Sequence, residues 1–281
     1  MTIPKIIHQT VPDKNKLDSI ISENISKLRS ANKNWDYRLY GDPECRDFIL
    51  ECYGPKMLGY YDRINPRYGA ARADLFRYLL VYEHGGIYLD IKSTVDGALD
   101  DVVHADDVYL LSKWKNGRGQ KYDGWGTYHP HIDGVDNEYQ QWHIVASAKH
   151  PFLEAVIEKV QNNIDSYDPF KDGVGKLGVM KLTGPIAYTA AIQPVLSRHA
   201  FSLVDIEDLG FRYSIVPSTK TNKYGHVELF ANHYTTLAEP VVTGRERGNI
   251  EKFLIRNSHH FRSAYRSLRR LVKRTLERSK A

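Results

Sequence analysis

Residues 70–93 read AARADLFRYLLVYEHGGIYLDIKS and carry the strongest local signals of this chain of 281 residues. Apolar side chains at helical spacing predict a helix over Arg67–His84. The pair Gly85-Gly86 ends that helix, because glycine readily takes the left-handed conformation that closes helices. The apolar run Ile87–Ile91 follows at once and predicts a buried strand. These residues therefore predict a helix, a tight turn and a strand in direct succession.

Three charged side chains in this segment suggest a binding site. Asp74 and Arg77 are three residues apart, so they share one face of the predicted helix. Asp90 lies at the carboxyl end of the predicted strand, where ligands bind in open α/β sheets. A carboxylate there can hold a divalent cation that in turn holds a diphosphate. An acid and an arginine on an adjacent face can bind ribose hydroxyls and phosphate.

The rest of the chain predicts an α/β fold with a mostly parallel sheet. Lys5–Gln9, a helix that ends near Ser30 and a strand over Trp35–Tyr40 form a βαβ unit, with Asp13 or Asn15 as the helix cap. Asp42 is expected to cap the next helix. Further strands are expected at 108–112, 142–148, 213–216 and 227–230, and further helices at 151–164 and 185–196.

Composition narrows the class of protein. Hydrophobic residues make up 42 % and charged residues 26 %, as in ordinary globular proteins. The spacing of Cys45 and Cys52 is neither that of a metal site nor that of a disulfide framework, so two reduced thiols of a cytosolic protein are expected. We see no signal peptide and no apolar run near the roughly 18–20 residues of a membrane span. The predicted location is the cytoplasm, with peripheral attachment to the inner face of the membrane as an alternative.

The charge is unevenly distributed. Residues 261–281 hold eight Lys or Arg and one acid, so their net charge is +7. Since the whole chain has a net charge of +5, residues 1–260 have a net charge of −2. Apolar residues within 261–281 recur at helical spacing, which predicts a basic amphipathic helix over 256–281 beside a main domain over 1–255. Such a helix is typical of binding to an anionic membrane surface, while packing on the body is the alternative. No nucleic-acid partner is expected, because the body is not basic.

The segment 70–93 resembles the signature of glycosyltransferase family 32, the DXD sugar-binding group. That group includes yeast initiating mannosyltransferases and capsular polysaccharide enzymes, and it shares a core with clostridial glucosylating toxins. Its pattern is (A/S)-x-(A/S)-D-x-x-R-Y … G-G-x-Y-x-D-x-D. The matching residues are Asp74, Arg77, Gly85, Gly86, Tyr88 and Asp90. Residues 3–10, 35–42, 146–151 and 182–185 resemble other landmarks of the group, so the resemblance spans about residues 3–240.

The resemblance implies a GT-A-like fold and a retaining glycosyltransferase that uses a nucleoside diphosphate sugar. Neither the resemblance nor the sequence identifies the base, and we favour UDP over GDP. It implies a glycan or lipid-linked acceptor and a role in cell-surface polysaccharide synthesis. Carried over by position, Asp74 and Arg77 contact the donor, and Asp90 faces the donor and its metal. His8 and Gln9 lie beside the base pocket. The motif residues Gly85, Gly86 and Tyr88 are assigned to the same donor site.

One departure from the family pattern concerns the metal, Mn²⁺ or Mg²⁺. The second acid of the motif is Lys92 here, so the motif reads Asp-Ile-Lys. Asp90 could hold the metal with another ligand, such as His233 or Asp96. Lys92 could instead neutralise the diphosphate itself and act as a catalytic residue beside Asp90. A third alternative is that the site is weakened and that the chain is a non-catalytic protein that binds sugar nucleotides or glycans. Asp90 could also only cap a turn.

Other candidate residues have structural alternatives. The acid pairs Asp100-Asp101 and Asp106-Asp107 suggest a glycosidase, but loop and helix-cap roles are favoured. In the long loop 115–138, His129 and His131 with Asp133 could bind a metal, although a solvated loop is favoured. Its aromatic residues, with Trp114, could form an acceptor platform or simply pack: Tyr122, Trp125 and Tyr128.

Overall fold

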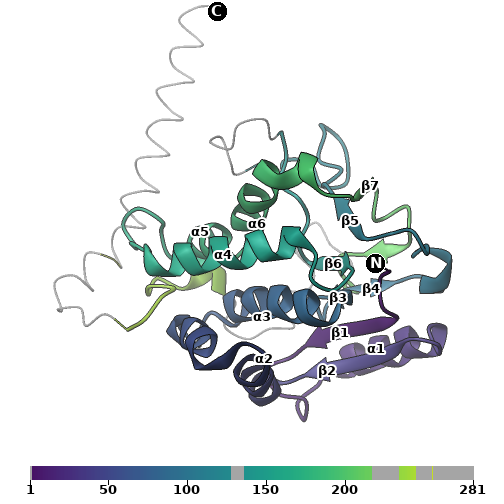
Figure 1. The fold of residues 1–281 in the computed structure, drawn as a ribbon, viewed down its shortest axis with the longest axis horizontal. Helices are drawn as coiled ribbons and strands as arrows, with labels where there is room; N and C mark the ends of the chain where they lie inside the picture. The colour runs from purple at the N-terminus through teal and green to yellow at the C-terminus, as the bar shows by residue number, and fades with distance from the viewer. Residues whose placement is uncertain (1, 128–135, 217–233, 245–254, 256–281) are drawn as a thin grey trace, which may run out of the picture.

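A computed structural model describes residues 2–127, 136–216, 234–244 and 255 of the chain. A six-stranded sheet with the order β2-β1-β3-β6-β5-β7 forms its centre (Figure 1). The strands are β1 (Ile6–Thr10), β2 (Asp36–Tyr40), β3 (Gly86–Leu89), β5 (Tyr109–Ser112), β6 (His143–Ala146) and β7 (Ser202–Val204).

The sheet is mostly parallel, as predicted. β1 runs parallel to β2 and β3, and β5 runs parallel to β7. Strand β6 is antiparallel to both of its neighbours, β3 and β5. Strand β1, the helix that follows it and strand β2 form the predicted βαβ unit, and the structure has the α/β class expected from the sequence.

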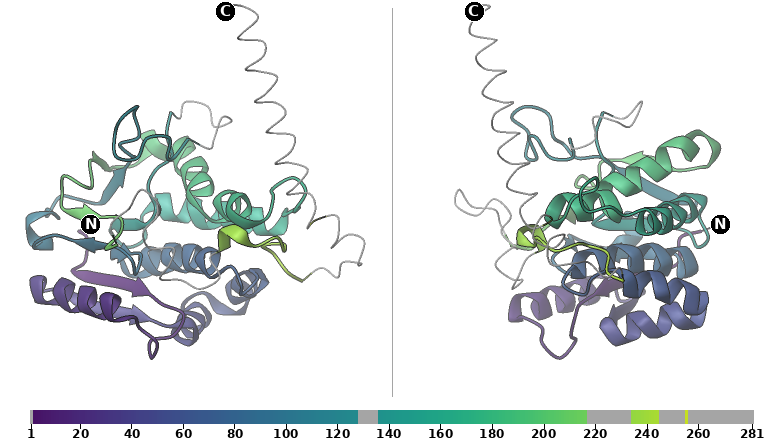
Figure 2. Two further views of the ribbon diagram at one scale, coloured as in Figure 1. Left: turned by 180° about the vertical axis from the view of Figure 1, so that it is seen from behind. Right: turned by 90° about the vertical axis from the view of Figure 1, so that its left-hand side faces the viewer.

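Helices cover both faces of the sheet. Their bounds are α1 (Ser19–Ala31), α2 (Asp42–Arg63), α3 (Gly69–His84), α4 (Pro151–Asp165), α5 (Gly175–Leu182) and α6 (Pro185–Ile192). Alternation along β3 decides which side each residue faces: Tyr88 joins the core under α2 to α6, whereas Ile87 and Leu89 face the opposite core with Leu28 of α1. Figure 2 shows α1 and α3 on opposite sides of the strands.

Smaller elements complete the described structure. Strands β4 (Thr94–Val95) and β8 (Phe211–Arg212) pair in a second, antiparallel sheet. Within the described part of the chain, 3₁₀ helices are also present at η1 (Leu99–Asp101), η2 (Gln193–Arg198) and η4 (Tyr234–Thr236). Among the described residues, no helix is long and apolar enough to cross a membrane. The helix predicted over 256–281 and the strand predicted over 227–230 lie outside the described residues.

Some predicted boundaries were wrong. Helix α1 begins at Ser19, because the Asp18 carboxylate caps it and accepts from the Ile20 amide at 2.9 Å. Gly41, not Asp42, is the N-cap of α2, and its amide donates to Glu44 at 3.0 Å.

Elements elsewhere in the chain also differ from the expectations. Residues 213–216 form no strand; β8 ends at Arg212. Helix α5 and strands β4 and β7 were not predicted, since they are short or rich in glycine. Cys45 and Cys52 are both free thiols on α2.

The glycine turn between α3 and β3 is needed for close packing. Gly85 and Gly86 have φ of 65° and 94°, in the region that disfavours side chains. A Cβ at Gly86 would lie 2.6 Å from the Ile6 carbonyl oxygen, and one at Gly85 would lie 2.6 Å from the Ala148 nitrogen. The two glycines therefore let β3 approach β1 and the segment after β6.

The ring of His8 connects β1 to this turn. Its Nε2 donates to the Gly85 carbonyl oxygen at 3.0 Å, and the Tyr40 hydroxyl lies 3.4 Å from Nδ1. The side chain is fully buried, and burial lowers the pKa of His8 from 6.5 to about 3. His8 is therefore neutral in the folded protein at ordinary pH.

We expect Gly86→Ala to lower the free energy of unfolding by about 2–4 kcal/mol, because it combines a strained φ with overpacking against β1. Gly59→Ala is the matched control, since Gly59 lies inside α2 with no atom near its added Cβ. That control should be neutral or slightly stabilising. Urea unfolding of both variants measures the difference, and equal stabilities would contradict the close approach.

The buried His8 predicts a pH dependence of stability. Its folded pKa is depressed, so the unfolded chain binds a proton below pH 6.5 while the folded chain does not. The stability that His8 contributes is present above pH 6.5 and is lost as pH falls toward 3, by about 1.4 kcal/mol per pH unit. In His8→Gln the slope between pH 6 and 4.5, measured by urea unfolding, should be flatter by about this amount. Parallel slopes would contradict the burial of a neutral ring.

Candidate functional site

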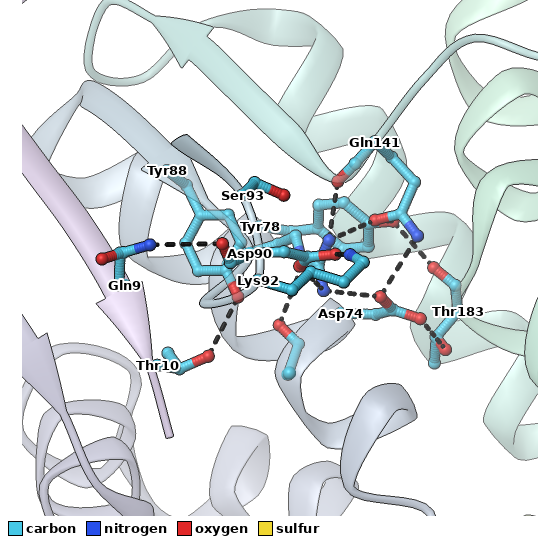
Figure 3. A network of polar contacts seen from close by, with 12 residues as sticks. Gln9, Thr10, Asp74, Tyr78, Tyr88, Asp90, Lys92, Ser93, Gln141 and Thr183 are labelled. Atoms are coloured by element: carbon cyan, nitrogen blue, oxygen red, sulfur yellow. Dashed lines mark hydrogen bonds and ion pairs between the residues drawn. The ribbon is translucent and has the colours of Figure 1, made fainter. Parts of the chain in front are cut away.

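A network of polar side chains lies where β3 ends (Figure 3). Its centre is Arg77 of α3, and its other charged members are Asp74, Asp90 and Lys92. Asp74 is one turn before Arg77 on α3, whereas Asp90 directly follows β3. The network thus joins the predicted helix to the predicted strand across the turn between them.

Arg77 uses its whole guanidinium group within the protein. One terminal nitrogen lies 3.0 Å from both Asp74 Oδ1 and Asp90 Oδ1. The other donates to the backbone and side-chain oxygens of Gln141 at 2.7 and 2.8 Å. The ring of Tyr88 lies against the guanidinium carbon, 4.7 Å from ring centroid to carbon. Burial opposes the charge, but the carboxylates of Asp90 and Asp74 outweigh it and raise the pKa of Arg77 above its usual range.

Asp74 is buried and holds segments that are distant in sequence. Thr183 donates its hydroxyl to Oδ2 at 2.8 Å, and Gln141 donates its amide to Oδ1 at 3.2 Å. Burial raises the pKa of Asp74, and the nearby Arg77 opposes that rise. Tyr78 extends the contact by donating its hydroxyl to the Thr183 carbonyl oxygen at 2.8 Å. Asp74 therefore orients Arg77 from inside the protein.

Asp90 forms the accessible side of the network, and the buried Lys92 lies against it. Lys92 Nζ makes an ion pair with Asp90 Oδ2 and lies 4.4 Å from the ring centroid of Tyr213. The Lys92 side chain is 9 % exposed and that of Asp90 is 21 % exposed. Burial lowers the pKa of Lys92, while the Asp90 carboxylate opposes that shift. Among the four charged residues, Asp90 offers the most surface to a ligand.

The structure brings most of the predicted site residues together at this end of β3. Gln9 donates its amide to the Asp90 carbonyl oxygen at 3.2 Å, and the Tyr88 hydroxyl lies 2.9 Å from Thr10 Oγ1. His8, Gly85 and Gly86 instead meet at the start of β3, where they support the turn. His233 lies outside the described residues. The donor-binding roles of all these residues stay predictions.

Sequence reasoning did not find Gln141 and Thr183. Gln141 precedes β6 and carries no local motif, so only the pairing of β6 with β3 places it beside Arg77. Thr183 lies in the landmark 182–185, which was noted for its order in the chain and not for its hydroxyl. That landmark was the available signal for a second member of the site.

The other candidate groups have structural contacts. Asp100 accepts from Lys5 at 2.8 Å and from the Trp35 indole at 2.9 Å. Asp107 caps the His104 amide at 2.8 Å, so the loop and cap interpretation of these acids fits their contacts. The rings of Trp114, Tyr122 and Trp125 pack on one another and on Tyr213, with centroids 4.8–6.5 Å apart. Tyr128, His129, His131 and Asp133 lie outside the described residues.

The described side chains do not fit a divalent metal. Within residues 2–127, 136–216, 234–244 and 255, no three His, Cys, Asp or Glu residues lie close enough to hold one. Asp90 offers its oxygens to Arg77 and Lys92, and Asp74 offers its oxygens to Arg77, Gln141 and Thr183. Asp96, considered as a second ligand, pairs with Arg212 at 2.7 Å.

Solved structures and curated proteins resemble this chain. "PaToxG Glycosyltransferase" has 15 % sequence identity and a TM-score of 0.48 over 70 % of each chain. "Inositol phosphoceramide mannosyltransferase 3" of Schizosaccharomyces pombe is 30 % identical over 189 residues, which are 66 % of this chain and 43 % of that protein. "Initiation-specific alpha-1,6-mannosyltransferase" of Candida albicans is 27 % identical over 57 % of this chain and 44 % of that protein. The chain thus spans less than half the length of these two relatives.

A family description matches the part of the chain that builds the network. Residues 19–109 match the glycosyltransferase sugar-binding region containing the DXD motif. This range includes the motif residues Asp74, Arg77 and Asp90. It also includes Lys92, the residue that departs from the motif. This match and these relatives confirm the resemblance of the chain to glycosyltransferases whose sugar-binding region contains the DXD motif.

Proposed function

We propose that this chain transfers a sugar from a nucleoside diphosphate sugar to a glycan or lipid-linked acceptor. The observation that carries the proposal is the Asp74–Arg77–Asp90–Lys92 network at the carboxyl end of β3, inside the region that matches the family. Ligands bind at such strand ends in α/β sheets. The mixture of fixed cations and a partly exposed carboxylate suits a polar, anionic donor.

The names of the relatives suggest which substrates to test first. One is named as a mannosyltransferase of inositol phosphoceramide, a lipid, and another as an initiation-specific α-1,6-mannosyltransferase. Mannose is therefore the first donor sugar to test, and both lipid-linked and glycan acceptors are candidates. For the base, UDP remains our first choice and GDP the second. Cell-surface or capsular polysaccharide synthesis is the proposed setting.

We assign each side chain a distinct role in the proposed reaction from its exposure and its contacts. Asp90 faces the donor, because it is the most exposed charged group of the network. Arg77, held by Asp74 and Gln141, keeps Asp90 in place. Negative charge grows on the diphosphate as the sugar leaves, and Lys92 is the cation beside Asp90 that can stabilise it. Retention at the anomeric carbon is proposed, with the leaving diphosphate available as the base that receives the acceptor proton.

A non-catalytic protein that binds sugar nucleotides or glycans is the second candidate. It is favoured by the engagement of both Asp90 oxygens with Arg77 and Lys92, which leaves the carboxylate no bare oxygen for a metal. The two candidates differ in turnover. Binding of a donor without release of its sugar to any acceptor or to water would support this second function.

We also propose that residues 261–281 bind an anionic membrane surface, because they carry a charge of +7. These residues lie outside the described structure. The full chain should sediment with vesicles that contain phosphatidylserine and remain in solution with neutral vesicles. A chain lacking residues 261–281 should lose this sedimentation. Equal sedimentation of both chains would contradict the proposal.

We expect Asp90→Asn to lower sugar transfer by about 100-fold or more, since an amide cannot replace a carboxylate between two cations and the donor. Transfer of labelled sugar from UDP- and GDP-linked donors to a lipid or glycan acceptor measures the effect. Asp96→Asn is the matched control, because Asp96 is an exposed acid that pairs only with Arg212 among the described residues. Full activity of Asp90→Asn would remove the proposed role.

A further inference from the structure

The residue that departs from the family motif is placed where a cation is needed. Lys92 stands at the position of the second acid, and its ammonium group pairs with the first acid, Asp90. We propose that the Lys92 ammonium replaces the divalent metal, so that this chain binds the diphosphate of its donor without a metal ion. This inference rests on the proposed function, because it concerns the same donor site.

Counting charges shows why the replacement is consistent. An acid at position 92 together with a divalent cation would contribute −1 and +2, which is a net charge of +1. The Lys92 ammonium contributes the same +1 without any ion. In the described network the carboxylates of Asp74 and Asp90 already balance Arg77 and Lys92, so the four charges sum to zero. A divalent cation added beside Asp90 would therefore find no uncompensated negative charge among these four residues.

Of the two cations, the buried Lys92 is the one with N–H donors left for a ligand. The donors of Arg77 are taken up by Asp74, Asp90, Gln141 and the Ala73 carbonyl oxygen. An ammonium group has three N–H donors. Within the described residues, the only oxygen that accepts from Lys92 Nζ belongs to Asp90. The remaining donors can therefore bond the oxygens of a diphosphate.

The surroundings of Lys92 keep its ammonium in position. The Tyr213 ring lies on one side of it, 4.4 Å from Nζ to the ring centroid. The backbone of Lys92 is held as well, because its carbonyl oxygen accepts from the Ile215 amide at 2.7 Å. Asp90 beside it is 21 % exposed, so the pair borders the surface from which a donor would enter. A cation fixed in this way needs little reorganisation when charge develops on the diphosphate.

The test measures binding of UDP, GDP, CDP and dTDP to the full chain by calorimetry, first with EDTA and then with Mn²⁺. We expect at least one diphosphate to bind, with a dissociation constant that differs by less than about threefold between the two conditions. Lys92→Met keeps the length of the side chain and removes its charge. It should weaken that binding by about tenfold or more in EDTA.

Two variants sharpen the test. Lys92→Asp restores the second acid of the family motif, so its binding should be weak in EDTA and should recover with Mn²⁺. Mn²⁺ alone should raise the melting temperature of Lys92→Asp and leave that of the unchanged chain where it was. Lys149→Met is the matched control, because Lys149 also pairs with one acid, Glu83, but on the surface. Its binding should equal that of the unchanged chain.

The outcomes separate the two proposals. Binding by the unchanged chain only when Mn²⁺ is present would overturn the role of Lys92 and leave the proposed function standing. Undiminished binding by a folded Lys92→Met in EDTA would also overturn that role alone. If the unchanged chain binds none of the four diphosphates in either condition, both the inference and the proposed function fail.

Discussion

The buried guanidinium of Arg77 is the constraint on which the site depends. Moving such a charge out of water costs several kcal/mol unless carboxylates and hydrogen-bond acceptors surround it. Asp74, Asp90 and Gln141 provide these partners from a helix, a strand end and the segment before β6. Each of these elements must therefore reach the same point for the charge to be tolerated. The glycine turn makes this possible, because Gly86 lets β3 pack directly on β1.

In the function proposed above, the same network supplies the charge that the family motif would provide through a metal. With Asp74 and Asp90 both engaged, the site is electrically balanced by Arg77 and Lys92. Charge balance, and not the identity of an ion, is what a departing diphosphate requires. An acid with a bound metal and an ammonium group are two ways to supply the same net charge. They differ in what they depend on, since an ammonium needs no ion from solution.

Much of this arrangement could be predicted from local patterns. Helical spacing placed Asp74 and Arg77 on one face, and the end of an apolar run placed Asp90 at the strand's edge. Predictions were wrong where weak local signals compete: Asp18, and not Asp13 or Asn15, caps α1, and residues 213–216 form no strand. Tyr213 instead packs its ring against Lys92, a role that depends on a neighbour 121 positions away.

The order of the amino acids was enough to predict the helix, the glycine turn and the strand, because these depend on spacing and backbone freedom within a few residues. It also determined that a lysine stands where the family has an acid. The contacts of Gln141 and Thr183 with Asp74 span 67 and 109 residues and became visible only in the folded chain. The fold alone placed the Lys92 ammonium on Asp90 and beside Tyr213. The physical reason is that such contacts follow from the order of strands in the sheet, which no local pattern encodes.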